Sequence, residues 1–212
     1  IPCVMAPNYS TAMNVLFINF ERLAIRTDRD VARIKAEVEK RVKPLGRKVY
    51  AVGDVHGGAD LLLKLLEDLR SDAQTGEYEG RPILIFLGDY IDRGFQSKDV
   101  INILLSNSVS SFETYFLKGN HEQAMLQFLG DPGIGPRWAE YGGAETMVSY
   151  GVQPPRTRTS IDEWMQASAD LQAALPSEHL HFLKSLELSV RVGDYVFVHA
   201  GVRPGFPLAP QC

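Results

Sequence analysis

Four short polar clusters along this chain carry the residue types that bind metal ions or phosphate. They read GDVHGG at 53–58, GDYIDRG at 88–94, GNHE at 119–122 and HAG at 199–201, and each closely follows a short apolar run. Carboxylate, amide and imidazole groups are the ligands that hard and borderline divalent cations prefer. A single Gly-Asp pair after a strand is typical of a turn, but four clusters of this kind in order predict a metal site.

Five side chains in these clusters are candidate metal ligands: Asp54, His56, Asp89, Asn120 and His199. Two of them, Asp54 and His56, lie two residues apart in a stretch expected to be extended, so both can face one ion. A second ion can share Asp89. Two ions about 3.5–4 Å apart hold a phosphate group and a hydroxide for in-line attack. The ligand set therefore predicts phosphoester hydrolysis.

Three further residues, Asp92, Arg93 and His121, are candidates for steps that the ions do not perform. Arg93 can pair bidentately with phosphate oxygens. His121 directly follows the candidate ligand Asn120, so we expect it near the leaving group, where Asp92 can orient it as a general acid. Considered alone, Arg93 is more typical of a solvated charge, and Asn120 of a helix N-cap.

The clusters must be brought together by regular structure, and the sequence predicts three strand–helix units. Apolar runs alternate with helical periodicity, at 48–52, 59–70, 82–87, 98–105, 114–117 and 122–129. This alternation predicts an α/β fold with parallel βαβ units. Ligands bind beyond the carboxyl ends of parallel strands, so the polar clusters are expected to converge there.

An N-terminal segment, residues 1–46, precedes these units. Its first part, 1–20, shows no period and is expected to be irregular. Apolar positions at helical spacing predict an amphipathic helix over 28–42. Residues 21–48 carry ten Lys or Arg against five Asp or Glu, which we interpret as a solvated helix face.

The remaining residues, 47–212, form the main domain. Gly, Pro and polar residues become frequent over 130–178, which we interpret as a mostly helical insertion beside the sheet. Within it, Ser160-x-x-Glu163 has the pattern of a capping box and predicts the start of a helix. Two apolar stretches after the insertion predict a pair of strands joined by a tight turn, at 186–192 and 195–198.

Five other side chains receive a structural interpretation. His179 and His181 lie in a predicted helix, where two residues of separation turn the side chains about 200° apart, so they do not share an ion. We expect both to be structural or exposed. Trp138, Tyr141 and Trp164 lie where they can flank a substrate, but core packing is the expected role of each.

Composition excludes several classes of protein. The chain has 212 residues, 45% apolar and 23% charged, with a formal net charge of −4, which is ordinary for a globular protein and gives no bulk attraction to nucleic acid. No run approaches the roughly 20 apolar residues of a membrane span. The two cysteines, Cys3 and Cys212, do not form a disulfide framework. We therefore expect a cytoplasmic protein with neither nucleic acid nor membrane as a partner.

In order along the chain, the motifs Gly-Asp-x-His-Gly, Gly-Asp-x-x-Asp-Arg-Gly and Gly-Asn-His-Glu resemble the signature of the PPP phosphoprotein phosphatases, a branch of the calcineurin-like metallophosphoesterases. The resemblance spans about residues 48–205 and is closest to bacterial serine/threonine protein phosphatase-like members. It implies a β-sandwich flanked by helices. It also implies two divalent metal ions, with manganese expected first and iron or zinc as alternatives.

The resemblance assigns roles to the candidate ligands. One ion is held by Asp54, His56 and Asp89, and the other by Asp89, Asn120 and His199. Asp89 therefore bridges the two ions in the implied site.

The same resemblance makes His121 with Asp92 the proton donor and Arg93 the residue that grips phosphate. The implied enzyme hydrolyses phosphomonoesters through a hydroxide bound by the two metal ions. Its expected substrates are phosphoproteins carrying phosphoserine or phosphothreonine, phosphotyrosine as well, or small phosphoesters. Two alternatives stay open: a dinucleoside polyphosphate hydrolase, although such relatives usually lack the full Asp92-Arg93 pair, and a phosphate-binding module that has lost turnover.

Two features depart from the family pattern. Phe95 stands where the family usually has proline. The family also has a further strand ending in a histidine and a further phosphate-gripping arginine, and this sequence stops at Cys212 before both. We therefore expect an incomplete second sheet, with three alternative consequences: the chain is a fragment of a longer product, a homodimer covers the sheet, or the second ion binds weakly.

Overall fold

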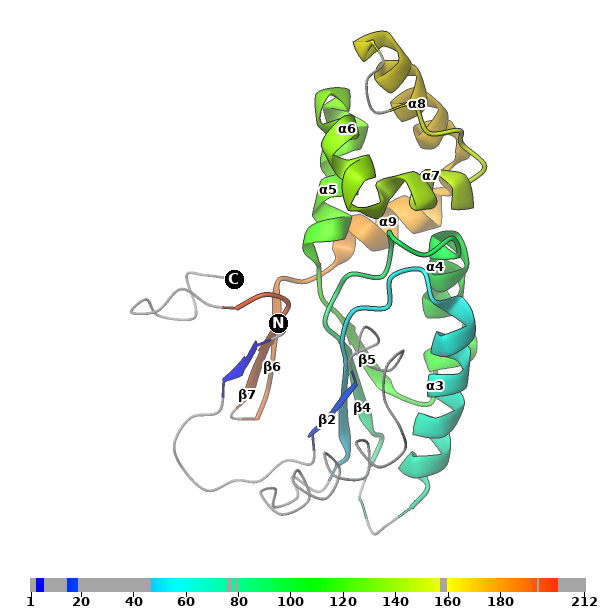
Figure 1. The fold of residues 1–212 in the computed structure, drawn as a ribbon. Helices are drawn as coiled ribbons and strands as arrows, with labels where there is room; N and C mark the ends of the chain where they lie inside the picture. The colour runs from blue at the N-terminus through cyan, green and yellow to red at the C-terminus, as the bar shows by residue number, and fades with distance from the viewer. Residues whose placement is uncertain are drawn as a thin grey trace.

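The structure is a computed structural model (Figure 1) that describes residues 47–75, 78, 80–156, 160–193 and 195–201, together with the backbone of 3–5 and 15–18. The amphipathic helix expected over 28–42 lies outside these residues, as does Cys212.

A parallel sheet of four strands, in the order β2-β3-β4-β5, forms the centre of the fold. The strands are β2 (Val15–Ile18), β3 (Val49–Val52), β4 (Ile83–Phe86) and β5 (Glu113–Phe116). All residues of β3 and β4 are buried, as the continuous apolar runs predict for strands covered on both faces. The expected parallel units are confirmed.

The two faces of this sheet contact different layers. Tyr50 and Phe86 belong to the core shared with the helices α3 (Ala59–Ala73) and α4 (Ser97–Leu105), which cover one face. Their neighbours in the strands, Ala51 after Tyr50 and Ile85 before Phe86, belong to a second core with Phe197. Because side chains alternate across a strand, each strand contributes to both cores.

The second core lies against a small antiparallel sheet of order β1-β7-β6 (Figure 1). Its strands are β1 (Cys3–Met5), β6 (Ser189–Val192) and β7 (Tyr195–Val198). The strands β6 and β7 confirm the expected pair, although β6 begins later than predicted. The fold is thus α/β, with a main parallel sheet and a second small sheet.

The expectation that residues 1–20 are irregular was wrong, because the segment contains β1 and β2. These strands have three and four residues, too few to show a period of their own. Each forms by pairing with a strand far along the chain: β1 with β7, and β2 with β3.

A helical layer extends from the carboxyl end of the main sheet (Figure 1). It begins with α5, and its elements are α5 (Asn120–Gly130), η2 (Pro132–Ile134), α6 (Gly135–Trp138), η3 (Ala139–Gly143), α7 (Ala144–Ser149), α8 (Ile161–Ala174) and α9 (Ser177–Ser185). A short η1 (Asn107–Val109) lies between α4 and β5. Among the described residues, no helix combines the length and the apolar character needed to span a membrane.

Several local predictions can be compared with this layer. Ser160 does precede α8, but its hydroxyl makes no capping hydrogen bond; its carbonyl accepts from the Glu163 N–H instead, so the capping box was wrong. Trp138 and Trp164 are buried as expected, whereas Tyr141 is 58% exposed and its core assignment was wrong. A position on the helical π-turn η3, rather than on a regular helix face, explains this exposure.

Candidate metal centre

The four polar clusters meet at one edge of the main sheet. Asp54 and His56 follow β3, and Asp89 follows β4. Asn120 begins α5, just after β5, and His199 follows β7 of the second sheet. The site is therefore built from loops at strand ends, with the second sheet adding the last histidine.

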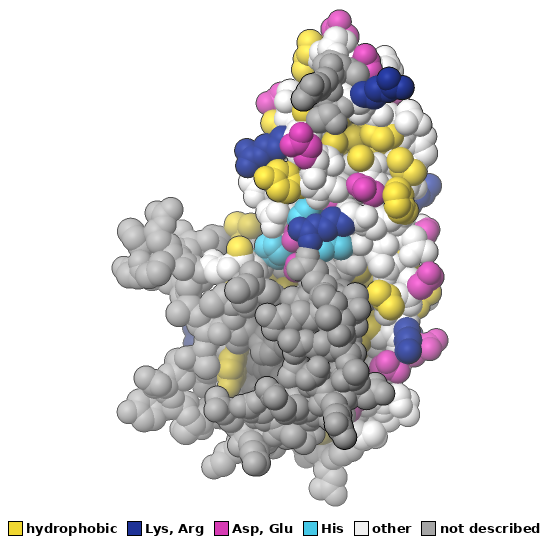
Figure 2. Space-filling model, in the orientation of Figure 1, with side chains coloured by type: hydrophobic (Ala, Val, Ile, Leu, Met, Phe, Trp, Pro, Cys, Tyr) yellow, Lys and Arg dark blue, Asp and Glu magenta, His cyan; other side chains and the backbone are white. Residues whose placement is uncertain are grey.

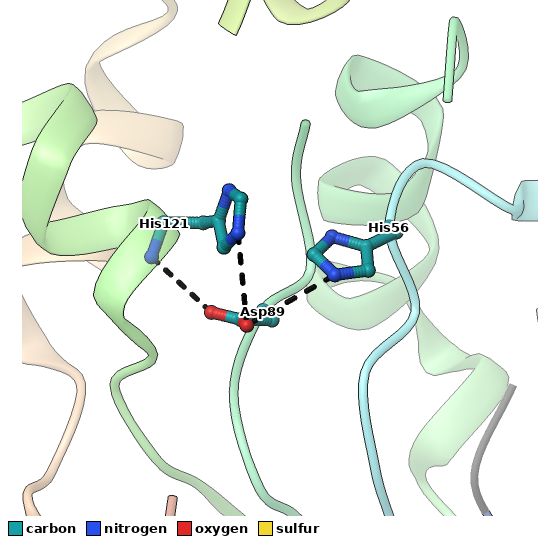
Figure 3. Close-up of side chains that lie close together, drawn as sticks. All are labelled: His56, Asp89 and His121. Carbon is teal, nitrogen blue, oxygen red and sulfur yellow. Dashed lines mark hydrogen bonds and ion pairs between the residues drawn. The ribbon is translucent and has the colours of Figure 1, made fainter. Parts of the chain in front are cut away.

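Asp89 lies at the centre of this arrangement (Figure 3). Its Oδ2 is 3.3 Å from Nε2 of His199 and 4.0 Å from Nε2 of both His56 and His121. The ligand atoms fall into two groups, each within 4.8 Å of one another: Asp89 with His56 and His121, and Asp89 with Asp54 and His199. One carboxylate thus belongs to both groups.

Neighbouring pairs from each ligand set that the resemblance implies also lie close together. Nε2 of His56 is 3.8 Å from Oδ2 of Asp54 and 4.0 Å from Oδ2 of Asp89. Nε2 of His199 is 3.0 Å from Oδ1 of Asn120. The groups differ from the implied sets in two ways. Asp54 groups with His199 instead of His56, and His121, which the sequence places as a proton donor, lies beside Asp89 in the group of His56.

The donor chemistry of this cluster fits divalent cations. It combines imidazole nitrogens, carboxylates and an amide oxygen, a mixed set suited to manganese, iron or zinc. The Nδ1 atoms of His56 and His199 lie 2.9 and 2.8 Å from the carbonyl oxygens of Ile91 and Leu87. A carbonyl only accepts, so Nδ1 carries the proton in both rings and Nε2 directs its lone pair into the site.

Nε2 of His199 faces two oxygens, Oδ2 of Asp89 and Oδ1 of Asn120, at 3.3 and 3.0 Å. Neither oxygen donates when Asp89 is ionised, so three lone-pair-bearing atoms converge. A proton on Nε2 or a bound cation is needed between them. This convergence is a second sign that the site is arranged to hold positive charge.

The charges of the site act on one another. Burial works against ionisation of Asp89, but the hydrogen bond and charge of His199, with the charge of His121, lower the pKa of its carboxyl below the ordinary value. Burial likewise works against a charged His199, yet Asp89 raises the pKa of this imidazole. Burial, helped by the nearby Arg93, lowers the pKa of His56. Asp89 is therefore ionised at neutral pH and able to bind a cation.

Backbone strain is concentrated at this site. Among the described residues, the only non-glycine residues with positive φ are His56 (45°), Asp89 (54°), Asp92 (71°) and Arg93 (67°), and all four are candidate site residues. Such conformations are costly for side chains other than glycine and persist where surrounding contacts hold them. Here the Asp89 carbonyl accepts from the His56 N–H at 3.0 Å, which ties two of the loops together.

Glu122 is a structural residue of the site to which sequence reasoning gave no role. Its side chain is fully buried, and Oε2 accepts from the N–H groups of Asp89 and Gly119, both at 2.9 Å. Oε1 accepts from the N–H of Tyr90 at 2.8 Å. Burial and the charge of Asp89 raise the pKa of Glu122 to about 7, although these backbone hydrogen bonds oppose the shift. The available signal was its place at the third position of α5, where a glutamate reaches back over the helix start.

His121 and Asp92 form the pair expected from the sequence. Nδ1 of His121 is 2.7 Å from Oδ2 of Asp92, and its Nε2 lies on the Asp89 side. Burial works against a charged ring, but the hydrogen bond to Asp92 and the charges of Asp89 and Asp92 raise the pKa of His121. The imidazolium form, which can give up a proton, is thereby favoured.

Arg93 is exposed beside these buried groups. Its N–H donates to the carbonyl of Gly142 at 3.0 Å, which anchors the residue to η3 of the helical layer. Figure 2 shows Lys or Arg side-chain atoms directly beside the histidine side chains on this face of the molecule. A cation at the mouth of the site suits the phosphate-binding role expected of Arg93.

Comparison with known proteins agrees with this geometry. A family model described as Calcineurin-like phosphoesterase matches residues 47–205. The asymmetrical bis(5'-nucleosyl)-tetraphosphatase PrpE of Halalkalibacterium halodurans is 36% identical over 101 residues, which are 46% of this chain and 39% of that protein. The zinc-dependent endopolyphosphatase of Saccharomyces cerevisiae is 25% identical over 180 residues, which are 81% of this chain and 52% of that protein.

An uncharacterized protein of Caenorhabditis elegans is 34% identical over 98 residues, covering 42% of this chain and 37% of its own length. The chain spans about half or less of the length of each of these relatives. The family model, in contrast, covers most of the chain and includes every candidate site residue. The chain therefore belongs to the calcineurin-like phosphoesterase family.

Proposed function

We propose that this chain is a metal-dependent phosphoesterase that hydrolyses phosphomonoesters. The observation that carries the proposal is the position of Asp89, which is shared by two groups of metal-binding side chains and lies beside the His121–Asp92 pair. A shared carboxylate suits two neighbouring divalent ions, and a neighbouring acid suits departure of an alcohol.

In the proposed site, Asp54, His56, Asp89, Asn120 and His199 hold two divalent ions, manganese first among the candidates. Bound there, the ions would neutralise phosphate charge and activate a water molecule. The residues of the chain supply binding and proton transfer. Their roles follow from the positions described above.

Arg93 binds phosphate oxygens from the exposed side of the site and orients the ester. His121, protonated on both ring nitrogens, donates the Nε2 proton to the leaving oxygen as the P–O bond breaks. Asp92 accepts from Nδ1 throughout and stabilises the charge of the ring before the transfer. His121 ends the step neutral, with its remaining proton on Nδ1.

Phosphoserine and phosphothreonine in proteins are the first proposed substrates. The adjacent Asp92-Arg93 pair, which matches the phosphoprotein phosphatase motif, supports this choice. A second candidate is hydrolysis of phosphoanhydrides in dinucleoside polyphosphates or polyphosphate. The activities for which the PrpE and endopolyphosphatase relatives are named favour it.

Comparison of rates tests the proposal and separates its two forms. EDTA-stripped protein is assayed with Mn²⁺ or Zn²⁺ on p-nitrophenyl phosphate, a phosphothreonine peptide, diadenosine tetraphosphate and polyphosphate. The proposal predicts metal-dependent hydrolysis of the two monoesters and its loss in Asp89→Asn. Faster release from the anhydrides would favour the second candidate. Absence of hydrolysis of all four substrates by folded, metal-loaded protein would contradict both.

A further inference from the structure

The carboxylate of Asp92 has hydrogen-bond partners other than His121. The residue is fully buried, and three groups hydrogen-bond to its carboxylate. Oδ2 lies 2.7 Å from Nδ1 of His121 and accepts from the indole N–H of Trp138 at 2.8 Å. Oδ1 accepts from the hydroxyl of Thr146 at 2.6 Å. Trp138 and Thr146 come from α6 and α7 of the helical layer, not from the sheet that bears the metal ligands.

The chemistry of these partners determines which group donates the proton in each hydrogen bond to the Asp92 carboxylate. The indole N–H of Trp138 has no acceptor lone pair, so it can only donate to Asp92. The hydroxyl of Thr146 also accepts from the Asp92 N–H at 2.9 Å, which leaves its own proton for the carboxylate. With two donors already directed at the carboxylate, Nδ1 of His121 is placed as the third donor. The second ring nitrogen, Nε2, is thereby turned toward the reacting centre.

The donors are themselves locked in place. The ring of Trp138 packs on Phe128, with centroids 5.0 Å apart, and the same indole leaves no room for a Cβ on Gly143. The hydroxyl of Thr146 lies 3.0 Å from that of Ser97, at the start of α4. Both donors are buried, at 2% exposure for Trp138 and none for Thr146. Held groups of this kind keep a carboxylate in one orientation without reorganisation during the reaction.

We propose that Trp138 and Thr146 are positioning residues for proton donation: they fix the Asp92 carboxylate so that His121 presents Nε2–H to the leaving oxygen. This inference rests on the proposed phosphoesterase function. The inference gives α6 and α7 of the helical layer a role in catalysis in addition to packing. The backbone of Asp92 has a strained φ of 71°. The hydroxyls of Ser97 and Thr146 hold it in this conformation, because both accept from the Asp92 N–H.

The test uses two substrates that differ in their need for a proton donor. Phenyl phosphate releases a basic phenolate and depends on protonation, whereas dinitrophenyl phosphate releases a weakly basic anion that does not. Loss of one hydrogen bond to Asp92 in Trp138→Phe should lower kcat for phenyl phosphate about tenfold relative to kcat for dinitrophenyl phosphate. The ratio of the two rates does not depend on the fraction of folded enzyme.

Trp164→Phe is the matched control. Trp164 is as buried as Trp138 and packs against the same Phe128, at 6.2 Å between centroids. Within the described part of the chain, its indole N–H has no hydrogen-bond partner. A general packing defect in the helical layer would therefore lower both rates equally in Trp164→Phe, and the ratio should stay within about twofold of wild type.

Two substitutions of Thr146, Thr146→Val and Thr146→Ser, provide a second, independent test. Valine removes the hydroxyl but keeps the shape, so the rate ratio should shift as in Trp138→Phe. Serine restores the hydroxyl and should restore the ratio. Equal losses on both substrates in Trp138→Phe and Thr146→Val would overturn the positioning role.

A measurement that does not depend on enzymatic activity tests this inference separately from the proposed function. In metal-free protein with isotope-labelled histidine, a proton–nitrogen correlation spectrum should show the Nδ1–H of His121, assigned with His121→Gln, as a strongly hydrogen-bonded proton. Trp138→Phe and Thr146→Val should shift that signal, and Trp164→Phe should not. An unchanged His121 signal in the first two variants would overturn the inference even if the wild type hydrolysed no phosphoester.

Discussion

Gly57 and Gly94 touch backbone to backbone at the edge of the candidate metal site. A Cβ built on Gly57 would lie 2.5 Å from the carbonyl oxygen of Gly94, closer than side-chain atoms tolerate. A Cβ on Gly94 would meet the carbonyl oxygen of His56 in the same way. The first two polar clusters therefore pack directly on each other, which holds His56 and Arg93 in their strained conformations.

Gly94→Ala should separate these loops and destabilise the fold. We expect a loss of about 2–3 kcal/mol in the free energy of unfolding, because the clash is with backbone that cannot move aside. Urea unfolding followed by circular dichroism measures the change. Gly130→Ala is the control, because a Cβ there meets nothing within 4 Å. Equal stability of the two variants would show that the loops do not depend on this contact.

Arg93→Lys should weaken phosphate binding while the metal site stays intact. A lysine keeps the charge but loses the planar fork that grips two phosphate oxygens. We expect the inhibition constant of inorganic phosphate to rise about tenfold, as for loss of one charged hydrogen bond. Arg70→Lys, on α3, is the control and should leave phosphate inhibition unchanged. Unchanged inhibition in Arg93→Lys would remove Arg93 from the phosphate-binding role.

Glu122→Gln should disturb the site through the backbone of Asp89. Both carboxylate oxygens of Glu122 face backbone N–H groups, and a glutamine amide directs its own N–H₂ at one of these donors. We expect the free energy of unfolding to fall by about 1–3 kcal/mol, since at least one buried donor loses its acceptor. Thermal unfolding with and without Mn²⁺ gives both stability and metal stabilisation. A variant as stable as wild type would mean that Glu122 is dispensable for this loop.

His179 makes stability depend on pH. Burial lowers the pKa of this imidazole below its ordinary value of 6.5. Its ring lies between the hydroxyl of Tyr150 at 2.9 Å and Oδ1 of Asn102 at 3.0 Å. The folded state therefore favours the neutral ring, while the unfolded chain takes up a proton as pH falls below about 6.5. The contribution of His179 to stability is present above that pH and is lost on acidification toward the lowered folded-state pKa.

Urea midpoints measured at several pH values between neutrality and about pH 5 check this sign. His179→Gln should show a flatter decline than wild type over that window. His181→Gln is the matched control, since His181 lies on the same helix but is exposed, and it should keep the wild-type slope. Identical slopes in all three proteins would show that His179 does not contribute to the acid response. The location of both residues agrees with the structural or exposed character expected from the sequence.

The parallel core could be predicted because its signals are local. Apolar runs such as Pro82–Leu87 are long enough to indicate buried strands, and each is followed by a helix with clear periodicity. The strands β1 and β2 could not be predicted, because three or four residues have no readable period and their partners are remote in the sequence.

The candidate ligands could be predicted because aspartate, histidine and asparagine after strand ends are typical of metal sites. Residues that support them could not, because their roles depend on contacts across the fold. Thr146 is an ordinary helix residue in the sequence, yet its hydroxyl reaches Asp92, which lies 54 residues earlier. Core packing was the expected role of Trp138, with a place beside the substrate as the alternative, and its indole N–H also donates to that carboxylate. Such side-chain partnerships leave no periodic pattern to read.

We infer that Asp89 is shared by two metal ions, and electron paramagnetic resonance of Mn²⁺-loaded protein can detect such a pair. We expect protein given two equivalents of Mn²⁺ to show the signal of an exchange-coupled pair. Asp89→Asn should lose the coupled signal, whereas Asp162→Asn, an exposed control on α8, should retain it. A spectrum of isolated Mn²⁺ ions alone in the wild-type protein would show that Asp89 does not join two ions.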